Sequence, residues 1–283
     1  MRTMILKEYH PLPKFPPVSI SGGECLLNCR HCSGTYLKGM VSATSPDELI
    51  SVGSKLKQSS GVGMLISGGS SPDGKLLNLD RMLPSISFIK EKLNLIVNIH
   101  PGLLEEDTAL RLNVDFASLD IQGDDIIKDV LGLKTSTEDY LKTYDILIQA
   151  GINVVPHVCI FSGGEDVLLN NIVPPPIIVV IVFTPTKKTP MENYSPPGAS
   201  IIGDVISKLH DKFPNTEISL GCMRPRDRSI RTEIEITALE AGIARIELPS
   251  RRTVQYAKMK GLAIKRFNSC CALPQELEAR VKT

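Results

Sequence analysis

The sequence predicts an α/β protein whose parallel strands close into a (β/α)8 barrel. Apolar, β-branched segments alternate with helix-like segments along the whole chain, a pattern typical of a parallel sheet covered by helices. Eight strand-then-helix units in about 250 residues favour a closed barrel over an open sheet. We expect one domain over residues 1–283, with the barrel at about 17–260, a short N-terminal extension, and a C-terminal extension at 261–283 over the barrel mouth.

The predicted strands are short apolar segments bounded by polar residues, glycine or proline. Strands that are buried on both faces of a parallel sheet have near-continuous apolar sequences, and the segment 177–183 (IIVVIVF) is the clearest case. In chain order, the predicted strands are 17–21, 63–67, 95–100, 116–121, 153–161, 177–184, 217–221 and 244–248.

The segments between these strands have the composition of helices. Ser45 and Pro46 form a helix start, and Thr137 with Glu138 opens a helix that stops at Gly151. In chain order, the predicted helices are 45–58, 79–92, 105–112, 137–150, a short one near Glu165, 199–212, 230–241 and 252–259.

Composition narrows the class of protein and its compartment. The longest apolar run has seven residues, far below the roughly twenty of a membrane-spanning helix. The N-terminus reaches Glu8 and His10 before any long apolar stretch and has no cleavage signal, so we expect a cytoplasmic protein without a membrane partner. Cytoplasmic thiols stay reduced, and the chain has an odd number of cysteines, seven, so metal binding or catalysis is expected of them rather than disulfides.

The charge is unevenly distributed. Residues 222–283 hold 13 Lys/Arg and 7 Asp/Glu, a net charge of +6, while the preceding residues hold 19 and 24, a net charge of −5. This balance argues against nucleic-acid binding but suits a local patch for an acidic partner. Four arginines, Arg224, Arg226, Arg228 and Arg231, follow the seventh predicted strand and are candidates for an anionic ligand, a second metal centre or a solvated face.

Three cysteines in the loop after the strand at 17–21 are the strongest chemical signal. Cys25, Cys29 and Cys32 have the spacing Cys-x3-Cys-x2-Cys. Three thiolates can hold three irons of a 4Fe–4S cluster and leave the fourth iron open to a ligand. Structural zinc needs four protein ligands, and His31 is the only nearby candidate, although it adjoins Cys32.

This cysteine loop, at the mouth of the first barrel unit, resembles that of the radical S-adenosylmethionine enzymes. The resemblance implies that Cys25, Cys29 and Cys32 ligate the cluster and that S-adenosylmethionine binds the open iron through its amino and carboxylate groups. Ser67, Gly68 and Gly69, which end the second strand, are similar to the turn that this family places against the methionine amino group.

Polar residues at other strand ends are candidate ligand contacts. Strand alternation places Asn98 and His100 on one face, likewise Ser118 and Asp120, and likewise His157 and Cys159. By resemblance, Asp120 contacts the ribose of S-adenosylmethionine, with Asn98, His100 and His157 as further contacts. The alternative for each residue is a satisfied polar group in the core.

The remaining four cysteines predict a second, auxiliary iron–sulfur cluster. Cys159 and Cys222 end two predicted strands, and Cys270 and Cys271 lie in the C-terminal extension. Because adjacent residues of an extended chain face opposite ways, Cys270 and Cys271 share a cluster only if the backbone bends between them. Buried free thiols are the alternative, since cysteine packs as a small hydrophobic residue.

Further motifs resemble the biotin-synthase and lipoyl-synthase branch, and in particular one component of the archaeal two-protein lipoyl synthase. These motifs are GCMRPR at 221–226, CCAL at 270–273, HPG at 100–102, TPT at 184–186 and TPM at 189–191. The segment 161–176 departs from the resemblance by being shorter.

The resemblance implies sulfur insertion into an octanoyl chain on a lipoyl carrier protein or peptide. It further implies a paralogous partner enzyme and an electron donor, and we expect the basic C-terminal end to dock the acidic carrier. The alternatives are a synthase of the same branch that acts on a small molecule, and a non-enzymatic barrel with structural zinc.

Overall fold

The computed structural model describes residues 5–282, which divide into two compact units. Unit 1 comprises residues 5–10, 155–185 and 193–282, and unit 2 comprises residues 11–154 and 186–192. Both units are built from parallel strands and helices, so the predicted parallel α/β class is confirmed. The single-domain organisation and the closure of an eight-stranded barrel stay predictions.

The sheet of unit 2 has the strand order β6-β5-β4-β2-β3. These strands are β2 (Pro17–Ser19), β3 (Val41–Ser42), β4 (Gly63–Ser67), β5 (Ile96–Ile99) and β6 (Phe116–Ile121). They pair in parallel, for example with Val18 opposite Ile66 and Leu65 opposite Asn98. The carboxyl ends of parallel neighbours therefore meet at one edge of the sheet, where the loops that follow β2, β4, β5 and β6 begin.

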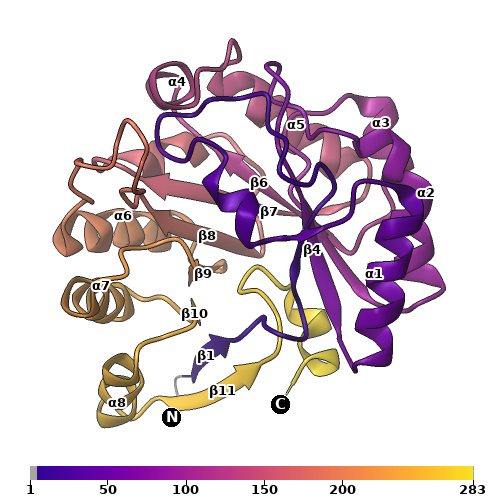
Figure 1. The fold of residues 1–283 in the computed structure, drawn as a ribbon. Coiled ribbons are helices and arrows are strands. Elements are labelled where there is room, and N and C mark those ends of the chain that lie inside the picture. The colour runs from indigo at the N-terminus through magenta and orange to yellow at the C-terminus, as the bar shows by residue number, and fades with distance from the viewer. Residues whose placement is uncertain (1–4, 283) are drawn as a thin grey trace. The chain divides into compact units, whose positions relative to one another are not determined.

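Helices cover the strands of unit 2 (Figure 1). They are α1 (Pro46–Gln58), α2 (Leu79–Glu91), α3 (Glu106–Arg111), the single turn α4 (Asp124–Ile126) and α5 (Thr137–Gln149). The predicted helix starts are confirmed: the Ser45 side chain accepts the Glu48 N–H at 3.3 Å, and Ser136 forms a reciprocal capping box with Asp139 at the start of α5.

The sheet of unit 1 has the order β11-β1-β10-β9-β8-β7. Its strands are β1 (Ile5–Tyr9), β7 (Asn153–Ile160), β8 (Ile177–Val182), β9 (Glu217–Leu220), β10 (Arg245–Glu247) and β11 (Ala263–Phe267). The helices α6 (Ala199–Lys212), α7 (Arg228–Glu240) and α8 (Arg251–Met259) follow one another beside these strands (Figure 1). Short helical turns at Glu165–Leu169 and Gln275–Arg280 complete the unit.

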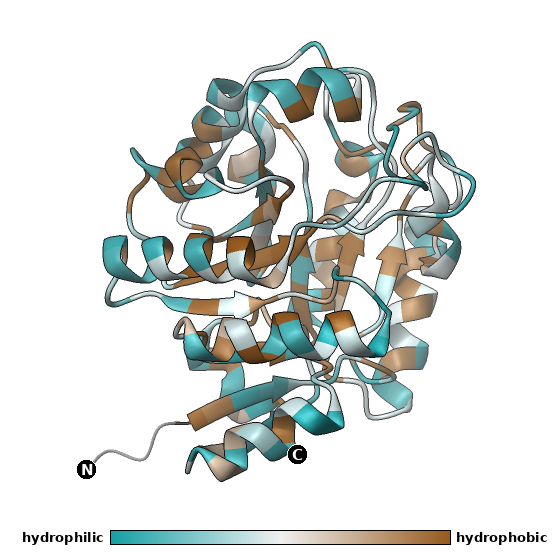
Figure 2. Ribbon diagram, turned by 90° about the vertical axis from the view of Figure 1, so that its left-hand side faces the viewer, coloured by the Kyte–Doolittle hydropathy of each residue, from teal (hydrophilic) through white to brown (hydrophobic). Residues whose placement is uncertain are grey.

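Hydropathy explains why these segments form these elements. The strands are mostly apolar, whereas the helices alternate apolar and polar residues (Figure 2). In β8, for example, five of six residues are buried. In α6, the buried side chains of Ile202, Ile206 and Leu209 recur at helical spacing, which places one apolar stripe toward the strands. Within the described residues, no helix combines the length and apolar character needed to cross a bilayer.

The prediction of eight strands was too low, because eleven strands lie within residues 5–282. All eight predicted strands are present, with ends that differ by at most two residues. The expected N-terminal extension contains β1, which pairs with both β10 and β11, and the expected C-terminal extension begins with β11. The third additional strand, β3, has only two residues and pairs with β2.

Candidate metal centres

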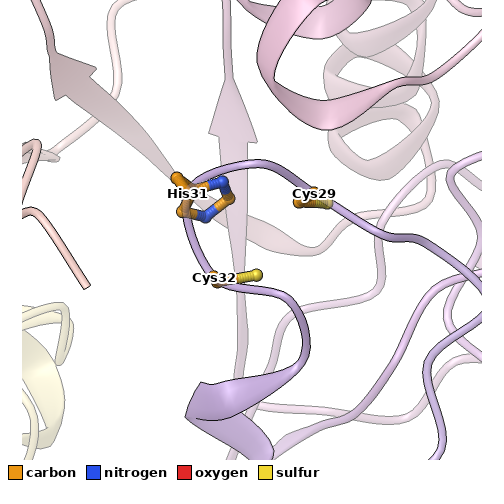
Figure 3. Close-up of side chains that lie close together, drawn as sticks. All are labelled: Cys29, His31 and Cys32. Carbon is orange, nitrogen blue, oxygen red and sulfur yellow. The ribbon is translucent and has the colours of Figure 1, made fainter. Parts of the chain in front are cut away.

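The cysteine loop of unit 2 begins just after β2 and brings three potential metal ligands together. One ligand atom each from Cys29, His31 and Cys32 lies within 4.8 Å of the other two (Figure 3). This separation is similar to the largest distance between two thiolates on one zinc ion, about 4.6 Å, because each Zn–S bond is about 2.3 Å long. The sequence did not indicate that the side chain of His31, which adjoins Cys32, lies this close to both sulfurs.

Cys25 lies outside this group of three and contacts the turn after β4. The main-chain N–H of Ser70 donates a hydrogen bond to the Cys25 sulfur at 3.5 Å, and the Ser70 carbonyl accepts the Leu26 N–H at 3.0 Å. These two bonds fasten the first part of the cysteine loop to the end of the neighbouring strand. N–H groups that donate to a ligating sulfur also tune an iron–sulfur cluster.

The glycine turn at the end of β4 packs directly against the cysteine loop. The Gly69 N–H donates to the Ser21 hydroxyl at 2.7 Å, and the space that a side chain at Gly69 would need is filled by the main chain of Glu24 and Cys25. Ser67 contributes its carbonyl, which accepts the Ile20 N–H at 2.8 Å. The glycine at 69 is therefore required by the packing of the loop.

A turn of π-helix, Ile127–Leu131, supports the other side of the cysteine loop. The Cys29 thiol donates to the Leu131 carbonyl at 3.4 Å, and the Arg30 N–H donates to the Val130 carbonyl at 2.8 Å. Turns of π-helix are rare and occur often at functional sites. Sequence periodicity did not reveal this one, because it is only five residues long.

Neighbouring groups shift the pKa values of two thiols in this loop in opposite directions. Cys29 and His31 lower the pKa of Cys32 to about 4. Cys32 and burial raise the pKa of Cys29 above its ordinary range. A lowered thiol pKa favours the thiolate, which is the form that binds a metal.

Polar residues at the ends of β5 and β6 form two distinct pairs. Asn98 and Ser118 are buried and donate to each other at 3.0 and 3.1 Å. His100 Nδ1 lies 3.6 Å from Asp120 Oδ2, and the Asp120 side chain is 49% exposed. Asn98 therefore has its partner within the sheet, whereas the Asp120 carboxylate is accessible to a ligand.

Unit 1 gathers three of the other four cysteines. Cys222 follows β9, and Cys270 and Cys271 follow β11. All three thiols interact electrostatically with one another, and those of Cys222 and Cys271 also interact with the buried carboxyl of Glu247 at the end of β10. Sequence reasoning missed Glu247, because a glutamate at a strand end normally faces solvent.

The two remaining residues predicted for these sites lie on β7. His157 is buried, and its Nδ1 lies 3.1 Å from the Val155 carbonyl oxygen. Cys159 is half-buried and stands opposite Ile181 of β8 in the strand register.

The arginines after β9 have different environments. Arg224 is 4% exposed and pairs with the buried Glu235 at 2.7 Å, and it donates further to main-chain carbonyls. Arg231 pairs with the same carboxylate at 2.8 Å. Arg224 is thus an internal structural group, whereas Arg226 and Arg228 are exposed.

No protein-family model matches the sequence, and no curated protein matches it. Solved structures are similar in fold over nearly the whole chain. Methylornithine synthase (PylB) has a TM-score of 0.60 and 17% identity, over 93% of this chain and 83% of that one. The FeFe-hydrogenase maturase HydG from Carboxydothermus hydrogenoformans has a TM-score of 0.61 and 15% identity, over 92% and 67%.

A third similar structure is SuiB from Streptococcus suis, bound to S-adenosylmethionine. Its TM-score is 0.52 at 12% identity, over 94% of this chain and 58% of that one. SuiB is also similar in its form bound to the precursor peptide SuiA. The chain therefore shares its fold with a synthase, a maturase and a protein that binds S-adenosylmethionine.

Proposed function

We propose that this protein is a radical S-adenosylmethionine enzyme of the cytoplasm, in which Cys25, Cys29 and Cys32 hold a 4Fe–4S cluster. The observation that carries the proposal is the packing of the three-cysteine loop between the Gly68–Gly69 turn and the π-helical turn at Ile127–Leu131. The donor set fits such a cluster, because soft thiolates select iron–sulfur centres and three of them leave one iron open.

S-adenosylmethionine is the proposed ligand of the open iron. The accessible Asp120 carboxylate, next to His100, suits the two hydroxyl groups of a ribose, since a carboxylate accepts hydrogen bonds at both oxygens. The glycine turn beside Cys25 is the proposed contact of the methionine amino group, because glycines let main-chain atoms approach a ligand closely. The fold shared with SuiB, which was solved with this ligand bound, supports the proposal.

When bound and reduced, such a cluster would supply the one electron that cleaves S-adenosylmethionine to methionine and a 5′-deoxyadenosyl radical, which abstracts hydrogen from carbon. The chain's own residues hold the cluster, orient the ligand and exclude solvent. An external electron donor is required for each reduction.

Production of 5′-deoxyadenosine tests this proposal. Protein that has been loaded with iron and sulfide without air and then reduced is expected to convert S-adenosylmethionine to methionine and 5′-deoxyadenosine. Alanine variants of Cys25, Cys29 and Cys32 are expected to form none, whereas Cys159→Ser keeps the cleavage. A loaded wild type that forms no 5′-deoxyadenosine would refute the proposal.

The proposed overall reaction is sulfur insertion into an octanoyl chain on a lipoyl carrier protein or peptide, together with a paralogous partner. The three clustered thiols of unit 1 support it, because an auxiliary iron–sulfur cluster there would offer sulfide for a new C–S bond. Exposed arginines of the basic C-terminal part, such as Arg226 and Arg228, suit an acidic carrier.

Incubation with an octanoyl-lysyl peptide and the partner protein tests this reaction. We expect thiolated octanoyl product by mass spectrometry. Carrier binding is expected to weaken with salt, and binding that is indifferent to ionic strength would remove the electrostatic part. Turnover of a small molecule without any thiolated peptide would favour the second candidate, a synthase acting on small molecules, which the fold shared with methylornithine synthase supports.

One observation favours a candidate from another class, a structural zinc site. Cys29, His31 and Cys32 stand at a mutual separation that one ion can bridge. Metal analysis of protein purified without air separates the candidates: one zinc, with no iron or acid-labile sulfide, identifies the structural site.

A further inference from the structure

The thiol cluster of unit 1 is built around a buried carboxyl. Strand β10 ends at Glu247 and lies between β9 and β1, and β1 in turn lies beside β11. Because these strands are parallel, the segments that carry Cys222, after β9, and Cys270 and Cys271, after β11, emerge at the same edge as Glu247. Three separate segments therefore bring a carboxyl and three thiols to one edge of this sheet.

Glu247 interacts with two of the three cysteines. The main-chain N–H of Cys271 donates to Glu247 Oε2 at 3.1 Å. The thiols of Cys222 and Cys271 interact electrostatically with this carboxyl. Cys270 interacts electrostatically with both of the other thiols.

Two buried arginines hold these segments in place. Arg245, two residues before Glu247 on the same face of β10, is 0% exposed and donates to the carbonyls of Cys271 at 3.1 Å and Leu273 at 2.6 Å. Arg224, two residues after Cys222, donates to the Glu247 carbonyl at 2.6 Å. Both cysteine-bearing segments are thus fixed to β10 by guanidinium groups that contact the main chain.

The carboxyl at the centre of this arrangement has no cation of its own. Glu247 is 6% exposed, and within residues 5–282 no basic side chain forms an ion pair with it. The nearby Arg224 and Arg245 are paired with Glu235, Glu217 and Glu278 instead. An ionised carboxylate buried without a partner is costly, and coordination of a metal is one way in which proteins stabilise it.

Cys222 gives the cluster an opening to solvent. Cys222 is exposed to solvent, whereas Cys271 is only 3% exposed. A ligand or sulfur source can therefore approach from the Cys222 side.

We propose that Glu247 is the fourth ligand of the auxiliary cluster, so that Cys222, Cys270, Cys271 and the Glu247 carboxylate together hold it. This inference rests on the proposed function for the identity of the cluster and adds its ligand set. It assigns an oxygen ligand to one iron and leaves Cys159 outside the set. A carboxylate binds iron–sulfur iron less strongly than a thiolate, which makes that iron the exchangeable one.

The test uses a chain in which the first centre is removed by alanine at Cys25, Cys29 and Cys32. Only the auxiliary centre then binds iron, and the result does not depend on cleavage of S-adenosylmethionine. This parent chain is loaded with ferrous iron and sulfide without air. Iron, acid-labile sulfide and the electron paramagnetic resonance spectrum of the reduced protein are then measured, with circular dichroism as the check on folding.

We expect the parent chain to hold about four irons and four sulfides. Glu247→Gln is expected to lose at least half of the iron or to give a three-iron spectrum, Glu247→Cys to restore about four irons with an altered spectrum, and Cys159→Ser to match the parent. The reverse result, in which Cys159→Ser loses iron and Glu247→Gln retains it with an unchanged spectrum, would overturn the assignment of Glu247. A parent chain that is folded but takes up no iron would overturn the auxiliary centre, while 5′-deoxyadenosine formation by the wild type would still stand.

Discussion

A Cβ atom added to Gly69 would lie 2.5 Å from the Cα atom of Cys25 and 2.0 Å from the Glu24 carbonyl oxygen. Both neighbours are main-chain atoms, which cannot rotate away as a side chain can. The turn after β4 and the cysteine loop after β2 can therefore pack this closely only because residue 69 has no side chain. This fit fixes the position of the first proposed cluster ligand.

Substitution of Gly69 by alanine is expected to remove most of the iron from the first centre. The added methyl group must displace Cys25, and ligands displaced by about 1 Å no longer meet one cluster. Iron content and the absorbance of the loaded protein measure the effect. Gly23→Ala is the matched control, because no atom lies within 4 Å of a Cβ at that position, and equal iron in the two variants would refute the role of Gly69.

Replacement of Asp120 by asparagine tests the proposed contact with the ligand ribose. Loss of a charge-assisted hydrogen bond costs about 1.5–3 kcal/mol, so we expect S-adenosylmethionine to bind about 10–100-fold more weakly. Equilibrium binding to the loaded protein measures this, with Asp47→Asn at the exposed start of α1 as the control. Unchanged affinity in Asp120→Asn would place the ribose elsewhere.

The buried carboxylate of Glu235 makes stability depend on pH. Burial by itself raises its pKa, but the Arg224 charge and several hydrogen bonds outweigh burial and lower the pKa below the ordinary value. Because the folded pKa lies below the unfolded value of about 4.3, this group stabilises the fold above that pH, and the contribution is lost as pH falls through the folded pKa.

Glu235→Gln is therefore expected to lower the free energy of unfolding at pH 7 by about 3–5 kcal/mol, because it leaves the buried Arg224 without its counter-charge. The difference from wild type should shrink as the pH falls below about 4. Denaturant unfolding at a series of pH values measures both, and Glu138→Gln in the first turn of α5 is the exposed control. A difference that stays constant down to acid pH would contradict the linkage.

Arg245→Lys tests the attachment of the C-terminal cysteine segment. A lysine has no planar fork to reach the carbonyls of both Cys271 and Leu273, so Cys271 should become more accessible. We expect metal-free Arg245→Lys to be alkylated faster at Cys271, as measured by mass spectrometry, while the exposed variant Arg266→Lys on β11 behaves as wild type. If Cys271 stays equally protected below the unfolding transition, Arg245 does not position it.

Local patterns predicted the central strands and most helices. The strands β4 and β6 match their predicted residues, because continuous apolar segments such as 63–67 can be buried only inside a sheet. The helix starts at Ser45 and Thr137 carried their own capping signals. The apolar segments and capping residues that predict these elements lie within a few residues of each strand or helix.

The strand β1 could not be predicted, because its residues are stabilised by distant parts of the chain. Its segment, ILKEY, contains two charged side chains, and both Lys7 and Glu8 are buried. Lys7 pairs with Glu217 at 2.6 Å and Glu8 with Arg266 at 3.1 Å, more than 200 residues away. When only neighbouring residues are considered, two charged side chains in five residues argue against a buried strand.

The same limit applies to the candidate sites. The spacing of Cys25, Cys29 and Cys32 predicted a metal-binding loop, but the contacts of this loop with Ser70 and Leu131 depend on residues that are distant in sequence. Glu247 in its short strand carries no motif at all, and its burial among cysteines appears only when β9, β10 and β11 are arranged in one sheet.

The most direct test of the central claim is the electron paramagnetic resonance spectrum of a chain that carries only the first centre. Cys222→Ala with Cys271→Ala removes the auxiliary ligands, and the loaded, reduced protein is measured with and without S-adenosylmethionine. We predict about four irons per chain and a 4Fe–4S signal whose g-values shift when S-adenosylmethionine binds the open iron. A chain that binds zinc without iron, or a cluster signal that S-adenosylmethionine leaves unchanged, would contradict the claim.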